Sequence, residues 1–100
     1  MTETQSRKSA MSKNSEQKIR NAVQLYKAGE FEKAESLYND VLETEPQHPD
    51  ANFGIGCLAF QAEEFDDAEA FFRRALERNP NHIGCLLALA KLYGKQNKQN

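Results

Sequence analysis

The chain has 100 residues, of which 39% are hydrophobic and 28% charged, and its net charge at pH 7 is −2. This is the size of one small domain with enough apolar residues for a core, which argues against a wholly disordered chain. The balance lacks the basicity of a nucleic-acid-binding domain, so no nucleic-acid partner is expected. No run approaches the roughly 18 apolar residues of a membrane span, and the polar start lacks the apolar stretch of a signal peptide, so a cytoplasmic protein is expected.

The first 14 residues are predicted to form a flexible polar tail, because they show no periodic apolar pattern. Beyond them the apolar spacing becomes helical: Ile19, Val23 and Tyr26 stand at i, i+4 and i+7 on one helix face. The same spacing recurs along the chain. It predicts helices near residues 15–28, 31–45, 49–62, 65–79 and 83–96, followed by a polar tail over 97–100.

Proline and glycine mark the boundaries of these helices. Pro46 and Pro80 are expected to end the second and fourth helices, since proline lacks an amide donor and clashes with the preceding turn. Gly29 suits the short turn between the first two helices, where a left-handed residue is often needed. No stretch alternates with the period of two that is typical of a strand, so the predicted fold is all-α.

The sequence repeats itself with a period of 34 residues. When residues 15–48 are aligned on residues 49–82, nine of the 34 positions are identical, and a third unit begins at residue 83. The identical positions include Phe31 and Phe65, Ala34 and Ala68, Leu42 and Leu76, Pro46 and Pro80, and His48 and His82. A fixed period of this length is typical of stacked supersecondary units, none of which can bury its apolar face alone.

The repeated residues resemble the tetratricopeptide repeat, which has the pattern W-x2-L-G-x2-Y…A-x3-F…P over 34 residues. The second unit matches this pattern best. Gly56 stands at the glycine position, Ala68 and Phe72 form the A-x3-F pair, and Pro80 is the closing proline. Asn52 stands where the pattern has tryptophan.

This resemblance covers two full repeats, at 15–48 and 49–82, and the first helix of a third, incomplete repeat at 83–96, which could also be a capping helix. It implies an α-solenoid of antiparallel helix pairs with about five helices. It also implies a protein–protein interaction scaffold without catalysis of its own. No catalytic residue, cofactor or metal is therefore expected.

The first helices of tetratricopeptide arrays line a concave groove, and the resemblance implies such a groove here for a peptide or partner protein. Its apolar stripe could accept an amphipathic helix or an extended peptide, or could pack between adjacent first helices. Tyr26 and Phe60, near the helix ends, are expected to be its most exposed contacts. The residues predicted to line the groove are Ile19, Val23, Tyr26, Lys27, Phe53, Cys57, Phe60, Gln61, Leu87 and Lys91, with Glu16, Asp50, Gly84 and Lys95 beside them.

One well-known ligand of the family is not expected. Family members that hold the C-terminal carboxylates of chaperones use lysine and asparagine side chains in this region. Here Ile19, Val23, Phe53 and Leu87 occupy it. The carboxylate clamp is therefore missing, and no chaperone tail is predicted to bind.

The predicted helix over 83–96 has almost no polar face, although a helix that is apolar all round is normally buried. Its companion helix is absent from the repeat pattern, so a second copy or a partner could cover it, or these residues could belong to a longer array. The residues predicted for self-association are Ile83, Leu86, Leu87, Leu89, Leu92 and Tyr93. Two alternative functions follow: a self-assembling structural unit, or an N-terminal regulatory or oligomerisation piece of a larger enzyme such as a glycosyl- or sulfotransferase.

Other chemistry is not favoured by the residue pattern. His48 and His82 recur because the repeat recurs, and no cysteine or carboxylate joins them at metal-ligand spacing. Cys57 and Cys85 have the character of small, partly buried apolar residues rather than nucleophiles. No glycine-rich phosphate loop or Ser-His-Asp arrangement is present.

Overall fold

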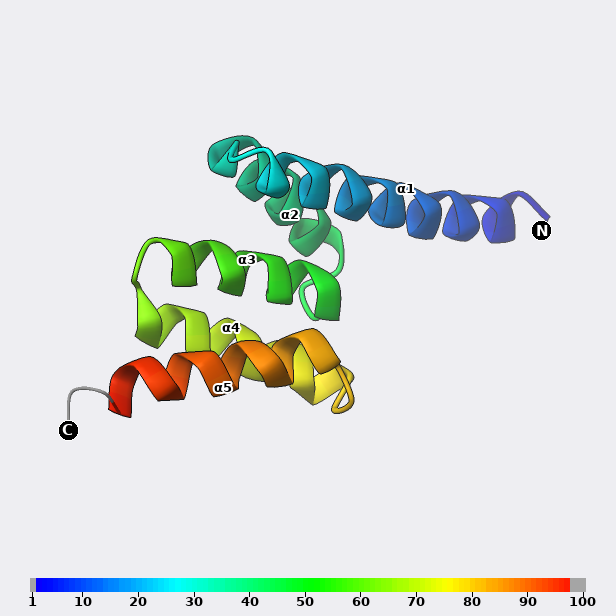
Figure 1. Cartoon of the computed structure of the whole chain (residues 1–100). Coiled ribbons are helices and arrows are strands. Elements are labelled where there is room, and N and C mark those ends of the chain that lie inside the picture. The colour runs from blue at the N-terminus through cyan, green and yellow to red at the C-terminus, as the bar shows by residue number, and fades with distance from the viewer. Residues whose placement is uncertain (1, 98–100) are drawn as a thin grey trace.

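The computed structural model describes residues 2–97, with the side chains of residues 14–96. Five helices follow one another: α1 (Thr2–Lys27), α2 (Phe31–Thr44), α3 (Pro49–Gln61), α4 (Phe65–Arg78) and α5 (Ile83–Asn97). Within residues 2–97 there is no strand. Helices α1, α3 and α5 lie on one side of the array, with α2 and α4 behind them (Figure 1). The predicted all-α solenoid of helix pairs is confirmed.

Helix α1 begins well before residue 15, where the sequence pattern placed its start. Residues 2–14 contain no proline or glycine and several good helix formers, so they are helical without an apolar face. Apolar periodicity reports packing rather than helicity, and the predicted boundary was wrong for this reason. The first buried side chain is Ser15, whose hydroxyl donates a hydrogen bond to the Glu45 carboxylate after α2. Flexibility of residues 2–14 stays a prediction, and residues 1 and 98–100 of the expected tails lie outside the described residues.

Two histidines cap the helices that open the second and third units. The Nδ1 atom of His48 accepts a hydrogen bond from the Ala51 amide at 3.3 Å, and that of His82 accepts one from the Cys85 amide at 3.1 Å. Each bond satisfies one of the amides that the first turn of a helix leaves unpaired. The recurrence of histidine in the repeat therefore has a structural cause.

The turns inside the two helix pairs share one backbone conformation. Gly29 has φ +82°, as its predicted place in a left-handed turn requires. The residue 34 positions later is Glu63, which adopts φ +62° in the turn between α3 and α4. A side chain in the left-handed region costs energy that glycine does not incur.

Replacing Glu63 by glycine is therefore expected to raise the free energy of unfolding by about 0.5–1 kcal/mol. Urea denaturation followed by circular dichroism would measure this change. Glu64→Gly is the matched control, because Glu64 has φ −90° and gains no relief from glycine. A loss of stability in the Glu63→Gly variant would contradict the strain at this turn.

The core consists of two clusters that meet in α3. Helices α1 and α2 join α3 around the buried ring of Tyr38, and α4 and α5 join α3 around that of Phe72. A Cβ atom added at Gly54 would stand 2.2 Å from the Tyr38 ring, and one added at Gly56 would stand 2.6 Å from the Phe72 ring. The two glycines therefore let α3 approach the Tyr38 and Phe72 rings closely.

Candidate functional site

Two adjoining clefts lie along the side formed by α1, α3 and α5. The α1–α3 cleft has a volume of about 450 Å³, and the α3–α5 cleft has a volume of about 270 Å³. Tyr26, Phe53 and Cys57 line both of them. The two clefts are therefore continuous, and together they are called the α1–α3–α5 groove below.

All ten residues predicted to line a partner-binding groove lie in these clefts. Ile19, Val23, Tyr26, Lys27, Phe53 and Cys57 line the α1–α3 cleft, and Phe60, Gln61, Leu87 and Lys91 are added in the α3–α5 cleft. Their contact with a partner stays a prediction. The floor of the groove was missed, because Tyr38 and Phe72 reach it from the second helix of each pair.

The exposed apolar side chains of the groove are not the expected ones. Val23 is 37% exposed and Leu87 is 62% exposed. Tyr26 and Phe60 are only half-buried rather than open, because each packs on a ring from the next helix. The centroids of Tyr26 and Phe31 are 5.3 Å apart, and those of Phe60 and Phe65 are 5.5 Å apart.

Phe53 lies at the centre of the groove and is held from two sides. Its ring centroid is 5.8 Å from that of Phe72 and 4.8 Å from that of His82. The His82 ring also contacts Asp50, with Nε2 and Oδ1 2.9 Å apart. Since Nδ1 of His82 accepts a backbone hydrogen bond, Nε2 carries the proton and donates it to the Asp50 carboxylate.

Both nitrogens of His82 are thus used in hydrogen bonds that hold the first turn of α5. Among the described residues, no group of three or more His, Cys, Asp or Glu side chains is placed to hold a metal ion. The structural interpretation of the repeated histidines follows from these bonds.

The cysteines have the properties of apolar core and lining residues. Burial raises the pKa of the Cys57 thiol to about 12, and that of the Cys85 thiol to about 11. Both thiols are protonated at neutral pH, whereas a nucleophilic cysteine reacts as the thiolate. Cys57 contributes shape to the groove rather than reactivity.

The end of the groove away from Asp50 and His82 carries lysine side chains. Lys27 lines the α1–α3 cleft, Lys91 lines the α3–α5 cleft, and the Lys95 ammonium lies 5.7 Å from the centroid of the Phe60 ring. The ion pairs found among the described side chains, Lys33–Glu30 and Arg73–Glu69, include none of these lysines, and neither does the hydrogen bond between His82 and Asp50. Nearby, the Gln61 side chain donates a hydrogen bond of 3.2 Å to the Tyr26 hydroxyl.

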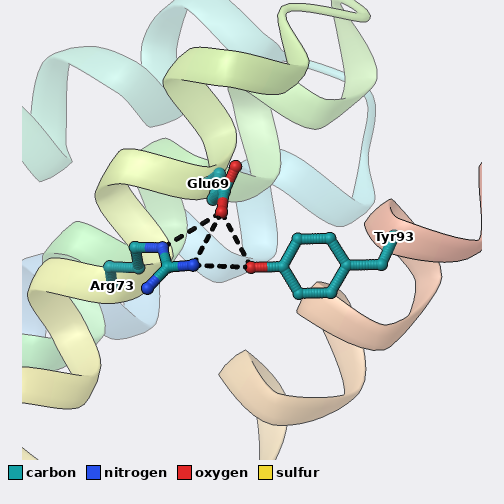
Figure 2. Close-up of polar contacts among 3 residues, drawn as sticks. All are labelled: Glu69, Arg73 and Tyr93. Atoms are coloured by element: carbon teal, nitrogen blue, oxygen red, sulfur yellow. Dashed lines mark hydrogen bonds and ion pairs between the residues drawn. The ribbon is translucent and has the colours of Figure 1, made fainter. Parts of the chain in front are cut away.

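A polar network fixes α5 against α4 (Figure 2). The Tyr93 hydroxyl donates to Oε2 of Glu69 at 2.7 Å and accepts from Nη2 of Arg73 at 3.0 Å, while Arg73 pairs with Glu69 at 2.9 Å. The hydrogen bond from Tyr93, and then those from Arg73, hold the pKa of the Glu69 carboxyl below its usual value. Arg73 and Glu69 form an i, i+4 pair within α4, and Tyr93 joins this pair to α5.

The outer side of α5 is only partly available for self-association. Ile83, Leu86, Leu87 and Tyr93 are exposed, but Leu89 and Leu92 are buried in the cluster around Phe72. The prediction that Leu89 and Leu92 belong to an association surface was wrong, because those two side chains already pack on α3 and α4. Leu87 faces the groove instead of a separate surface.

Comparison with known families agrees with the repeat seen in the fold. The family model described as Tetratricopeptide repeat matches residues 20–83. Because this match covers more than half of the sequence, the chain belongs to the tetratricopeptide repeat family. Repeats of this family generally mediate protein–protein interactions and are typically non-catalytic.

A search of curated proteins finds no match. Among the helices of residues 2–97, none has the length and apolar character that crossing a membrane requires.

Proposed function

We propose that this chain is a non-catalytic scaffold that binds a peptide, or a segment of a partner protein, in the α1–α3–α5 groove. The observation that carries this proposal is the continuity of the two clefts, with Val23 and Leu87 exposed on opposite sides of them. Exposed apolar side chains that converge on one concave surface are typical of protein interaction sites.

The groove is also suited to binding because its walls are held in place before a partner arrives. Phe53 packs between Phe72 and His82, and the Gln61–Tyr26 hydrogen bond joins the ends of α1 and α3. Preorganised side chains lose little conformational entropy on binding, so more of the contact energy remains as affinity.

The test compares two neighbouring leucines of α5. Peptides would be selected on the wild-type protein from a random library of displayed dodecapeptides, and their affinity measured by fluorescence anisotropy. Leu87→Glu, inside the groove, is expected to weaken binding by about tenfold or more, since it places a charge against the partner's apolar side chains. Leu86 is 48% exposed but lines neither cleft, so the Leu86→Glu control should leave peptide affinity and helicity unchanged.

Equal affinity of the two variants would exclude the groove as the binding surface. The same samples address a second candidate, self-association through the exposed Ile83 and Leu86 of α5. A molar mass near twice 11.4 kDa by light scattering, reduced to one chain by Leu86→Glu, would support it. A single-chain mass in the wild type would exclude it.

A further inference from the structure

We propose that the partner segment places apolar side chains over Phe53 and Cys57, and carboxylates at the end of the groove formed by the C-terminal ends of α1, α3 and α5. This inference rests on the proposed groove function and adds the chemistry and the direction of the partner. It is carried by the distribution of charge around the groove, which differs between its two ends.

Three helix ends meet at the cationic end of the groove. Figure 1 shows α1, α3 and α5 running in the same direction, so their C-terminal ends lie on the same side. Two contacts bring these ends together: the Gln61–Tyr26 hydrogen bond joins α3 to α1, and the Lys95–Phe60 contact joins α5 to α3. Lys27, Lys91 and Lys95 therefore surround one region.

Among the described side chains, no ion pair joins these lysines to a carboxylate of the neighbouring turns. Glu30 is paired with Lys33 at 2.9 Å, and Glu64 lines a different cleft on the other side of the array. Helix α5 itself contains no acidic residue. Glu63 is the remaining carboxylate of these turns, and no ion pair joins it to a lysine among the described side chains.

At the other end of the groove the acidic group is already engaged. The Asp50 carboxylate accepts the hydrogen bond of His82, so it offers less to a partner than a free carboxylate does. A partner segment lying in the groove thus meets a hydrogen-bonded acid near the N-terminal ends of α3 and α5, and three lysines near the C-terminal ends. This difference sets the direction of the segment.

The cleft on the opposite side of the array has the reverse charge. It is lined by Glu32, Glu35, Glu64 and Asp67, with no lysine or arginine among its lining residues. Lys27 and Lys91 line the groove, whereas Arg73 and Arg78 each line another cleft together with a glutamate. An acidic segment is therefore repelled by the cleft around Glu32 and Glu64 and attracted to the groove.

Lysines at helix C-terminal ends also stabilise the helices themselves. Lys27 and Lys95 lie in the last turns of α1 and α5, where a positive charge favours the helix dipole. Three helix ends carry about −0.5 charge each, which three lysines outweigh roughly twofold. Lys91 lies a turn earlier and lines the α3–α5 cleft, so the helix dipole does not account for its place.

The experiment repeats the selection of displayed dodecapeptides on three proteins: the wild type, Lys91→Glu/Lys95→Glu, and the control Arg74→Glu/Arg78→Glu. The control changes net charge equally but on the outer helix α4, and it leaves the Lys33–Glu30 pair intact. Wild-type selection is expected to enrich apolar residues followed by Asp or Glu. Affinity for such a peptide should fall about tenfold in Lys91→Glu/Lys95→Glu and within about twofold in the control, with weaker binding at high salt.

The failures of the two proposals are distinguishable. Enriched peptides without acidic bias, or equal affinities for the two charge-reversed proteins, would overturn the proposal of an acidic partner. The groove proposal would still stand in that case, provided that Leu87→Glu weakens binding. Binding that persists in Leu87→Glu would overturn the groove itself. Lys91→Gln/Lys95→Gln gives an intermediate loss if charge is responsible, and circular dichroism verifies that each variant is folded.

Discussion

Gly54→Ala is expected to lower the free energy of unfolding by about 1–3 kcal/mol, although alanine is the better helix former. The added Cβ atom would stand 2.2, 2.4 and 2.5 Å from three carbons of the Tyr38 ring. Tyr38 is buried between α2 and α3, so displacement of its ring would disturb the packing of the first core cluster. Urea denaturation followed by circular dichroism measures the loss.

The matched control for this substitution is Gly94→Ala. Gly94 also lies in a helix, but a Cβ atom added there would meet no atom within 4 Å. Its replacement should stabilise α5 by about 0.5–1 kcal/mol, the ordinary gain from alanine over glycine. Equal stability changes at the two glycines would contradict the close approach of α3 to the Tyr38 ring.

Phe72→Ala is expected to cost about 3–5 kcal/mol, since it removes a fully buried ring and leaves a cavity in the second core cluster. The ring is fully buried and contacts Phe53 and the backbone at Gly56. A domain of this size has a total stability of about 5–15 kcal/mol, so the variant should be largely unfolded in mild denaturant.

Phe31→Ala provides the comparison, because Phe31 is 41% exposed and its main aromatic contact is Tyr26. Its loss should cost about 1 kcal/mol or less. The midpoint of urea denaturation for both variants gives the measurement. A Phe72→Ala variant no less stable than Phe31→Ala would show that the second cluster does not depend on this ring.

Much of the fold could be predicted from the sequence because its signals are local and repeated. Pro46 and Pro80 each follow the end of a helix by two residues. The recurrence of Tyr38 as Phe72 identifies the same packing position in each unit. The start of α1 could not be predicted from apolar spacing, because residues 2–14 are helical by propensity alone. The left-handed Glu63 is visible only after the repeat is aligned on Gly29.

The walls of the candidate site were more predictable than its floor. Residues such as Val23 and Leu87 share the inward face of the first helices, which the helical period defines. The floor depends on rings that pass through spaces left by Gly54 and Gly56, and such spaces exist only between packed helices. The sequence also could not predict which groove side chains are most exposed, because Tyr26 is covered by Phe31 of another helix.

The position of α3 has a consequence for how the chain unfolds. This helix contributes to both core clusters, yet its 13 residues include Gly54 and Gly56, which make it a poor helix former by itself. Its helical state is maintained by the neighbours on both sides rather than by its own residues. In a linear array with nearest-neighbour coupling, such a weak central element joins its neighbours into one cooperative unit. If either α1 and α2 or α4 and α5 unfolded, α3 would lose half of its packing and unfold too. The helices on its other side would then lose their packing on α3.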